Sequence, residues 1–152
     1  MANEVELVAD FQCGQWQTME IPMPPSWNSM YRTFQNRMYR TASYVEWLKE
    51  AVAWMVRDLI PCRKPASIRI VVYGGKGFPE SRDLDNCLKA IMDALKPPAY
   101  EKRNPTKLKK PGAGIIADDC VRYVREKRIQ YVPRSNRKEE AEVRLFIAEV
   151  LE

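Results

Sequence analysis

Two aspartates and a lysine stand near the start of one strongly amphipathic segment, Ser81–Lys96. Asp83 and Asp85 are separated by one residue, and Lys89 follows Asp85 by four positions, about one helical turn. Carboxylate oxygens are the ligands that hard divalent cations prefer, and an ammonium group stabilises negative charge that develops on a phosphate. The chain contains no histidine, so a general base must be a carboxylate, a lysine or a metal-bound hydroxide. The segment therefore predicts the base of an active site that is held against a phosphate backbone.

The same segment has the periodicity of a helix with one buried face. Its apolar residues recur with helical spacing: Leu84, Cys87, Leu88, Ile91, Met92 and Leu95. The opposite face carries Asp85, Lys89, Asp93 and Lys96. A second acidic pair, Asp118–Asp119, precedes a later strand. Asp83, Asp85 and one member of that pair are candidates to converge on Mg²⁺ or Mn²⁺, because all-oxygen ligands favour these ions over zinc.

Each of these acids also has a simpler interpretation. Asp83 has the position of a helix N-cap, and Asp85 with Lys89 forms a pair that contributes only about 0.3–0.5 kcal/mol on an exposed helix. Asp118–Asp119 could form an ordinary turn. Together the acids favour a metal site, because a helix N-terminus carries partial positive charge and a cation there requires several carboxylates nearby.

The composition predicts one globular domain with an anionic partner. The 152 residues include 25 Lys and Arg against 20 Asp and Glu, a net charge of +5, and 45% are hydrophobic. We expect a single domain over 15–152 and a loose extension over 1–14. Prolines interrupt the basic stretch Lys96–Lys110, so we interpret 96–117 as a long basic loop that either contacts nucleic acid or is a solvated linker.

A second basic stretch alternates with aromatic residues after Pro24-Pro25. Its arginines and aromatic residues are Arg32, Arg37, Arg40, Tyr31, Phe34 and Tyr39. Two prolines followed by Ser26 and Asn28 indicate an extended segment that runs into a turn. This basic aromatic segment could contact DNA, or it could pack on the sheet of its own domain.

The elements that must position these residues alternate along the chain. We predict strands at Trp16–Met23, Ser67–Tyr73, Val121–Val132 and Ala141–Val150, with the last two forming an antiparallel hairpin. A capping box at Ser43–Glu46 should open a helix that runs to about Leu59. The inner face of this helix should hold Val45, Leu48, Val52, Met55 and Leu59. The fold class is therefore α/β (α+β), a small mixed β-sheet with two main helices packed on it.

The cysteines and the hydropathy pattern set the expected compartment. The four cysteines are far apart and form no C-x-x-C pair, which favours reduced, mostly buried thiols over a zinc site. No signal peptide or long apolar run is visible, so we expect a soluble cytoplasmic protein without a membrane partner.

Three segments resemble one known family. Arg82-Asp83-Leu84-Asp85-Asn86, with Lys89 beyond it, resembles the signature of RusA-type Holliday-junction resolvases. Pro24-Pro25-Ser26 with Asn28 and Tyr31 resembles that family's N-terminal segment, and Ala117-Asp118-Asp119 resembles its third acidic position. The resemblance covers roughly 21–150. The long basic connection at 97–117 and the additional N-terminal residues depart from the family, and they bear on substrate detail more than on the reaction.

The resemblance implies a small RusA-like homodimer that requires Mg²⁺ or Mn²⁺. Such proteins bind four-way DNA junctions by their structure and nick two strands symmetrically in DNA recombination and repair. Carried over by position, Asp83, Asp85 and Asp119 would bind the metal, and Lys89 would be the catalytic lysine. The family's many phage relatives imply a bacterial cell or a phage-infected host. A nuclease for forks or flaps, and a non-catalytic DNA-binding protein on the same fold, stay open.

The expected DNA contacts combine this resemblance with the charge pattern. Arg82 and Asn86 would contact DNA as neighbours of the acids. Phosphate contacts predicted from charge in the glycine-rich turn and basic loop are Lys76, Lys102, Arg103, Lys107, Lys109 and Lys110. The final hairpin would add Arg122, Arg125, Arg128, Arg134 and Arg137. Such contacts provide salt-dependent affinity and little sequence information.

Overall fold

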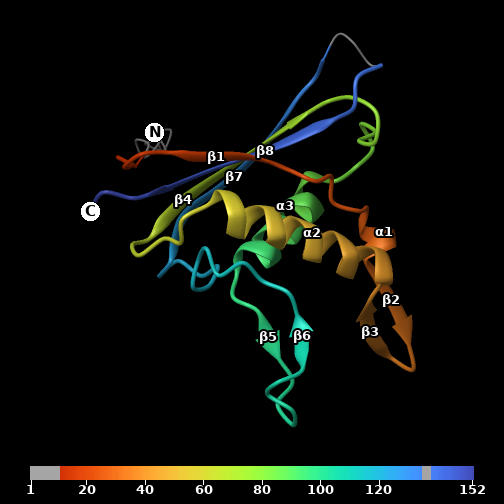
Figure 1. Ribbon diagram of the computed structural model, residues 1–152. Helices are drawn as coiled ribbons and strands as arrows, with labels where there is room; N and C mark the ends of the chain where they lie inside the picture. Colours follow the sequence, from red (N-terminus) through yellow and green to blue (C-terminus); the bar gives the residue numbers. More distant parts are fainter. Residues whose placement is uncertain (1–10, 135–137) are drawn as a thin grey trace, which may run out of the picture.

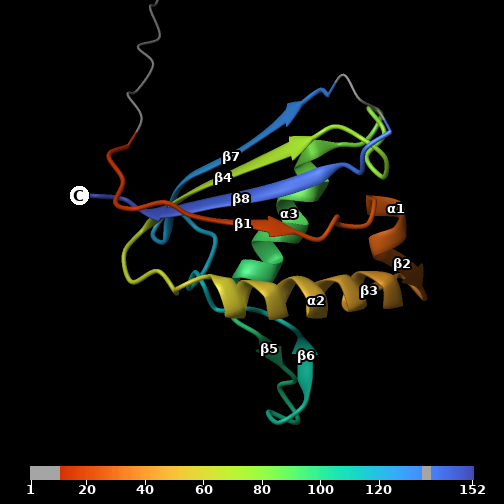
Figure 2. The same ribbon diagram turned by 45° about the horizontal axis from the view of Figure 1, so that its top comes forward.

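The computed structural model describes residues 11–134 and 138–152. Four strands form one mixed sheet, and the two long helices α2 and α3 cover one face of it (Figures 1 and 2). In chain order the described elements are β1 (Gln17–Ile21), α1 (Trp27–Met30), β2 (Tyr31–Phe34), β3 (Arg37–Arg40), α2 (Ala42–Asp58), β4 (Ala66–Tyr73), α3 (Leu84–Leu95), β5 (Ala99–Tyr100), β6 (Leu108–Lys110), β7 (Val124–Val132) and β8 (Glu142–Glu149). The predicted class, mixed α and β with a small sheet and two main helices, is confirmed.

The strand order corrects one prediction. The sheet runs β1-β8-β4-β7, with β4 parallel to β7 and antiparallel to β8. The predicted β7–β8 hairpin is therefore wrong, because β4 lies between these two strands. Burial explains the order. β4 is the most apolar strand and occupies an inner position, whereas β7 is rich in charged residues and forms an edge, where charge hinders pairing with another chain.

The core lies between the sheet and the helices. Val143, Leu145 and Ile147 share one buried face of β8, as predicted. The neighbouring strand β4 contributes Ile68, Ile70 and Val72. The helices contribute, among others, Leu48, Met55, Ile91 and Leu95. Burying each such side chain stabilises the fold by roughly 1.5–3 kcal/mol, so this packing holds α3 against the sheet.

The two helices begin at different kinds of cap. Asp83 is the N-cap of α3, as in the simpler of its two interpretations, because its carboxylate accepts the Asp85 N–H at 2.9 Å. The capping box predicted at Ser43–Glu46 is wrong: the N-cap of α2 is Thr41, whose hydroxyl accepts the Tyr44 N–H at 3.2 Å. Of the inner residues predicted for α2, Leu48, Met55 and Leu59 are buried, whereas Val45 and Val52 are only partly buried. The helix also buries Tyr44, Trp47 and Ala51.

The basic segment after α3 contains regular structure that the prolines did not predict. β5 and β6 pair as a short antiparallel hairpin that extends beyond the helices (Figure 1). The chain then returns to the end of α3. The Ala113 N–H donates to the Ala94 carbonyl at 2.8 Å and the Ile115 N–H donates to the Leu95 carbonyl at 2.9 Å. These bonds satisfy carbonyls that the helix leaves open at its C-terminus, and they bring the following acidic turn back beside α3.

The predicted loose extension, 1–14, is fixed in its last residues. Residues 1–10 lie outside the described part of the chain. The Gly14 N–H donates to the Glu149 carbonyl at 2.9 Å, and the Leu151 N–H donates to the Gln12 carbonyl at 2.7 Å. Residues 12–14 therefore run beside the last residues of the chain. A single helical turn, α1, stands where we expected only a turn after Pro24-Pro25.

The cysteine prediction is confirmed in part. All four thiols are free. Cys87 is buried, Cys13 and Cys62 are partly buried, and Cys120 is exposed, so the expectation of mostly buried thiols is too general. Burial raises the pKa of Cys87 to about 11, which keeps this thiol protonated. Over the described residues, the helices are too short or too polar for any of them to cross a membrane.

Candidate active site

The polar face of α3 lines a cavity of about 350 Å³. Its charged residues come from α3, from the turn before β7 and from β7 itself: Asp85, Lys89, Asp93, Asp119 and Lys127. Its other walls come from α1, β2, α2 and α3: Met30, Tyr31, Tyr44, Leu88, Ala90 and Met92. Residues far apart in the sequence thus present acids and ammonium groups to one space.

The structure brings together three of the four predicted catalytic residues. Asp85, Lys89 and Asp119 all line the cavity. Asp83 does not line it, and its carboxylate accepts the Asp85 N–H at the helix start. The neighbouring carboxylate of Asp118 accepts the Asp119 N–H at 2.8 Å. Within the acidic pair, Asp119 is therefore the member that lines the cavity.

A set of polar contacts connects the acidic turn to both helices. The Tyr44 hydroxyl donates to Asp93 Oδ2 at 3.0 Å. Lys96 Nζ lies 3.2 Å from Asp93 Oδ1 and 3.7 Å from Asp119 Oδ2. Lys96 thus bridges the last turn of α3 and the acidic turn, and it holds Asp119 beside the helix.

The surroundings of these groups shift two pKa values in opposite senses. Burial tends to lower the pKa of Lys96, but the carboxylates of Asp93 and Asp119 outweigh it and raise that pKa. Lys110 has a lowered pKa, because burial, together with nearby Lys96 and Arg40, outweighs the attraction of Asp93. Lys96 therefore stays an ammonium group at neutral pH and can hold its two carboxylate partners.

Lys110 corrects a prediction of DNA contact. Its side chain is buried, with 7% exposure, and its ammonium donates to the Asp93 carbonyl at 2.6 Å and to the Pro111 carbonyl at 3.1 Å. A lysine that bonds carbonyls near a helix C-terminus stabilises that end. Lys110 therefore fastens β6 to the last turn of α3 and does not reach outward to a phosphate.

Arg82 joins two of the segments that carry the family resemblance. Its Nη2 donates to the Pro24 carbonyl at 2.8 Å and to the Pro25 carbonyl at 3.1 Å. Its guanidinium also lies 4.6 Å from the centre of the Phe78 ring. These contacts hold the Pro24-Pro25 segment against the start of α3. Asn86, the other predicted neighbour in DNA contact, is partly buried in the first turn of the helix.

Most of the other predicted phosphate contacts are exposed, but some of them already lie beside a carboxylate. Lys76, Lys102, Arg103, Lys107, Lys109 and Arg122 are exposed. Lys107 Nζ lies 3.4 Å from Glu101 Oε1, and Arg125 Nε lies 2.7 Å from Glu152 Oε1. Only part of the predicted basic surface therefore presents charge that is not already balanced by a nearby carboxylate.

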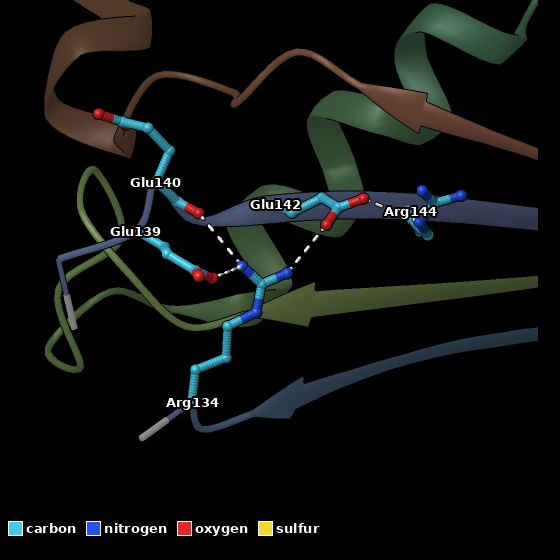
Figure 3. Close-up of polar contacts among 5 residues, drawn as sticks. All are labelled: Arg134, Glu139, Glu140, Glu142 and Arg144. Carbon is cyan, nitrogen blue, oxygen red and sulfur yellow. Dashed lines mark hydrogen bonds and ion pairs between the residues drawn. The ribbon is translucent and has the colours of Figure 1, made fainter. Parts of the chain in front are cut away.

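Arginines near the end of β7 are also engaged within the protein. Figure 3 shows Arg134 between Glu139 and Glu142, with its Nη2 at 2.8 Å from Glu142 Oε2. Glu142 in turn pairs with Arg144 at 2.8 Å. Arg128 lies 3.5 Å from Glu126, and Arg137 lies outside the described residues. The ion pairs of Arg134 thus connect the end of β7 with the start of β8. The two strands themselves do not pair, because β4 lies between them.

The donors of the cavity fit a hard cation in type. Asp85, Asp93 and Asp119 offer carboxylate oxygens, the ligands that Mg²⁺ and Mn²⁺ prefer. Across 11–134 and 138–152, however, no three acidic or cysteine side chains are arranged to hold a metal ion together. Mg²⁺ is commonly bound by one or two carboxylates plus substrate phosphates. Asp85 and Asp119 could therefore hold such an ion when a phosphate completes its coordination.

The sequence did not predict Tyr44 and Lys127 as candidate-site residues. It placed Asp93 on the polar face of the helix without a role, and it assigned Lys96 to the basic loop. Asp93 and Lys96 continue the stripe of Asp85 and Lys89 along α3, so their helical spacing was the available signal. Tyr44 was hidden within an apolar helix pattern. Lys127 reaches the cavity only because β7 pairs with β4, which no local pattern indicated.

A scan against models of protein families gives no match, and a search of curated proteins gives none either. The candidate function therefore rests on the residues of the cavity and on the motifs in the sequence.

Proposed function

We propose that the protein is a Mg²⁺-dependent, structure-selective endodeoxyribonuclease that resolves four-way DNA junctions by paired symmetric nicks. The observation that supports this proposal is the cavity shared by Asp85, Lys89 and Asp119. The activity is that of the RusA-type resolvases whose motifs the sequence resembles. A RusA-like fold and a homodimer are part of the same proposal, because two nicks related by two-fold symmetry suit a two-fold dimer.

The cavity residues would divide the chemistry as follows. Asp85 and Asp119 would hold the divalent ion, which when bound lowers the pKa of a water molecule and neutralises charge on the phosphate. Lys89 would place its ammonium near the scissile phosphate and stabilise its developing charge. Lys96 would keep Asp119 oriented toward α3. Asp83 would act indirectly, because its carboxylate fixes the first turn of the helix that carries Asp85.

One set of contacts favours a different class, a non-catalytic DNA-binding protein on the same fold. Lys96 pairs with both Asp93 and Asp119, and Asp83 is an N-cap, so these three acids each have a structural role. In that case removal of a carboxylate would alter stability, but there would be no cleavage to lose. A nuclease for forks or flaps would share the site and differ only in its substrate.

A digestion experiment separates these possibilities. The purified protein is incubated with Mg²⁺ and a panel of labelled four-way junctions, forks, flaps and duplexes. We expect symmetric nicks in the four-way junction, and we expect Asp85→Asn and Asp119→Asn to abolish cleavage while binding is retained, because loss of negative charge does not weaken attraction to DNA. Addition of EDTA should stop the reaction.

The acidic turn supplies a matched control. Asp118→Asn changes the neighbouring carboxylate, which lies outside the cavity lining and bonds the Asp119 N–H. This variant should retain most of the cleavage. Normal cleavage by Asp119→Asn, or equal loss in Asp118→Asn, would contradict the assignment of Asp119. Absence of cleavage for every substrate, with junction binding intact, would favour the non-catalytic protein.

A further inference from the structure

β2 and β3 form a two-stranded ribbon that extends from α1, away from the four-stranded sheet (Figure 1). Tyr31, the first residue of β2, lines the cavity, and residues 32–39 are all exposed. Gln35 and Asn36 have φ values of 48° and 59°. Positive φ at both central residues is what a two-residue type I′ turn requires, and its twist matches that of the flanking strands. The ribbon is therefore a defined hairpin.

The register of this ribbon sorts its side chains onto two faces. Arg32 pairs with Tyr39, and Phe34 pairs with Arg37. Cross-strand partners point to the same face, as do residues two positions apart. These four residues, which we call the Arg/aromatic face, therefore share one surface. The opposite face carries Tyr31, Thr33, Met38 and Arg40.

The opposite face begins against the body of the protein. The centres of the Tyr31 and Tyr44 rings lie 5.5 Å apart, and Tyr44 is a buried residue that lines the cavity. The Arg/aromatic face is thus directed away from this packing.

The Arg/aromatic face is unusual for a surface that contacts only water. Phe34 is 65% exposed and Tyr39 is 47% exposed. Residues 31–40 carry three arginines and no acid. Exposed rings offer stacking platforms for bases, and interleaved guanidinium groups attract the phosphates that connect those bases. Charge complementarity therefore favours a nucleic-acid strand whose bases are not already stacked in a duplex.

We propose that the Arg/aromatic face binds unpaired nucleotides of a DNA strand. Phe34 and Tyr39 stack on bases, and Arg32 and Arg37 contact phosphates. The choice of DNA over RNA rests on the proposed function, but the binding itself needs neither metal nor cleavage.

Fluorescence anisotropy tests this binding in the presence of EDTA. The probes are labelled oligothymidylate, which forms no internal pairs, and a blunt duplex of the same length. The full-length protein should bind the single strand more tightly than the duplex. Phe34→Ala and Tyr39→Ala should each weaken single-strand binding by about fivefold or more. Arg32→Gln and Arg37→Gln should each reduce the slope of log K against log salt by about 0.7.

The ribbon provides its own controls. Met38→Ala removes a side chain that is 63% exposed on the opposite face, so it should leave single-strand affinity unchanged. Phe34→Trp should retain binding because it keeps a stacking ring, whereas Phe34→Leu should weaken binding about as much as Phe34→Ala although an apolar side chain remains. Circular dichroism melting should confirm that every variant is folded.

Three results would overturn the proposal. The first is wild-type affinity in Phe34→Leu, which would show that stacking is not involved. The second is equal weakening by Met38→Ala and Phe34→Ala, which would remove the distinction between faces. The third is a sedimentation shift from dimer to monomer in Phe34→Ala, which would show that a second copy of the chain covers this face. Failure of the nuclease assay with single-strand binding intact would affect the proposed function alone.

Discussion

Tyr44 connects the candidate site to the helix opposite α3. Its hydroxyl donates to Asp93, and burial together with the charge of Asp93 raises the pKa of this hydroxyl well above its usual range. Tyr44 therefore remains protonated at neutral pH and acts only as a donor. Asp93 also pairs with the ammonium group of Lys96, which in turn pairs with Asp119. The Tyr44 hydroxyl therefore helps to fix Asp93 and, through it, Lys96.

Replacing Tyr44 with phenylalanine tests this role. Tyr44→Phe keeps the ring in the core and removes the bond to Asp93, so the free energy of unfolding should fall by about 1.5–3 kcal/mol, as for hydrogen bonds to charged groups. Urea denaturation at pH 7 measures the change. Tyr39→Phe is the control, since Tyr39 is exposed on the ribbon, and its unfolding midpoint should match that of the wild type. An unchanged midpoint in Tyr44→Phe would show that the bond adds no net stability.

At the scale of elements, the site depends on how the chain returns after the β5–β6 hairpin. Gly112 lies so close to the end of α3 that an added Cβ would stand 2.3 Å from the Lys96 carbonyl oxygen and 2.5 Å from the Pro97 carbonyl carbon. Only glycine permits this approach. From there the buried Ile115 and Ile116 lead the chain into the acidic turn, which places Asp119 at the cavity.

A methyl group at this position should therefore disturb both stability and activity. Gly112→Ala forces backbone atoms apart, and such overpacking typically lowers the free energy of unfolding by about 1–3 kcal/mol. Because the displaced segment carries Asp119, junction cleavage should fall as well, which a single-turnover assay would measure. Gly14→Ala is the control, because its Cβ would meet no atom closer than 3.8 Å. Wild-type stability and cleavage in Gly112→Ala would contradict this account of the return.

The elements that the sequence could predict are those that short-range patterns specify. Helix α3 and its Asp83 cap follow from spacing within 81–96, and the stripe that lines the cavity follows from the same periodicity. The pairing of β7 with β4 could not be predicted, since it depends on contacts between distant strands. The burial of Lys110 depends on the fold of β5 and β6 against α3, and a basic residue in a proline-rich stretch gave no sign of it.

At the scale of the whole molecule, the distribution of charge is more selective than the net charge of +5 suggests. Lys110 is buried, and Arg125 and Arg134 pair with carboxylates. The exposed lysines and arginine at the end of the β5–β6 hairpin lie in a part of the chain that extends beyond the helices (Figure 1). We therefore expect phosphate contacts to concentrate on this hairpin rather than along β7.

Removing charge from the hairpin should weaken DNA binding without altering the chemistry. The variant carries Lys102→Gln, Arg103→Gln and Lys109→Gln. Removal of one phosphate-binding cation should reduce the slope of log K against log salt by about 0.9 on duplex arms, while cleavage at saturating protein stays unchanged because none of these residues lines the cavity. The control removes the same charge from exposed positions on α2 and the connection after it: Lys49→Gln, Arg63→Gln and Lys64→Gln. Equal slopes in the two variants would mean that DNA binding depends only on the net charge of the protein. The β5–β6 hairpin would then not be a specific DNA-binding surface.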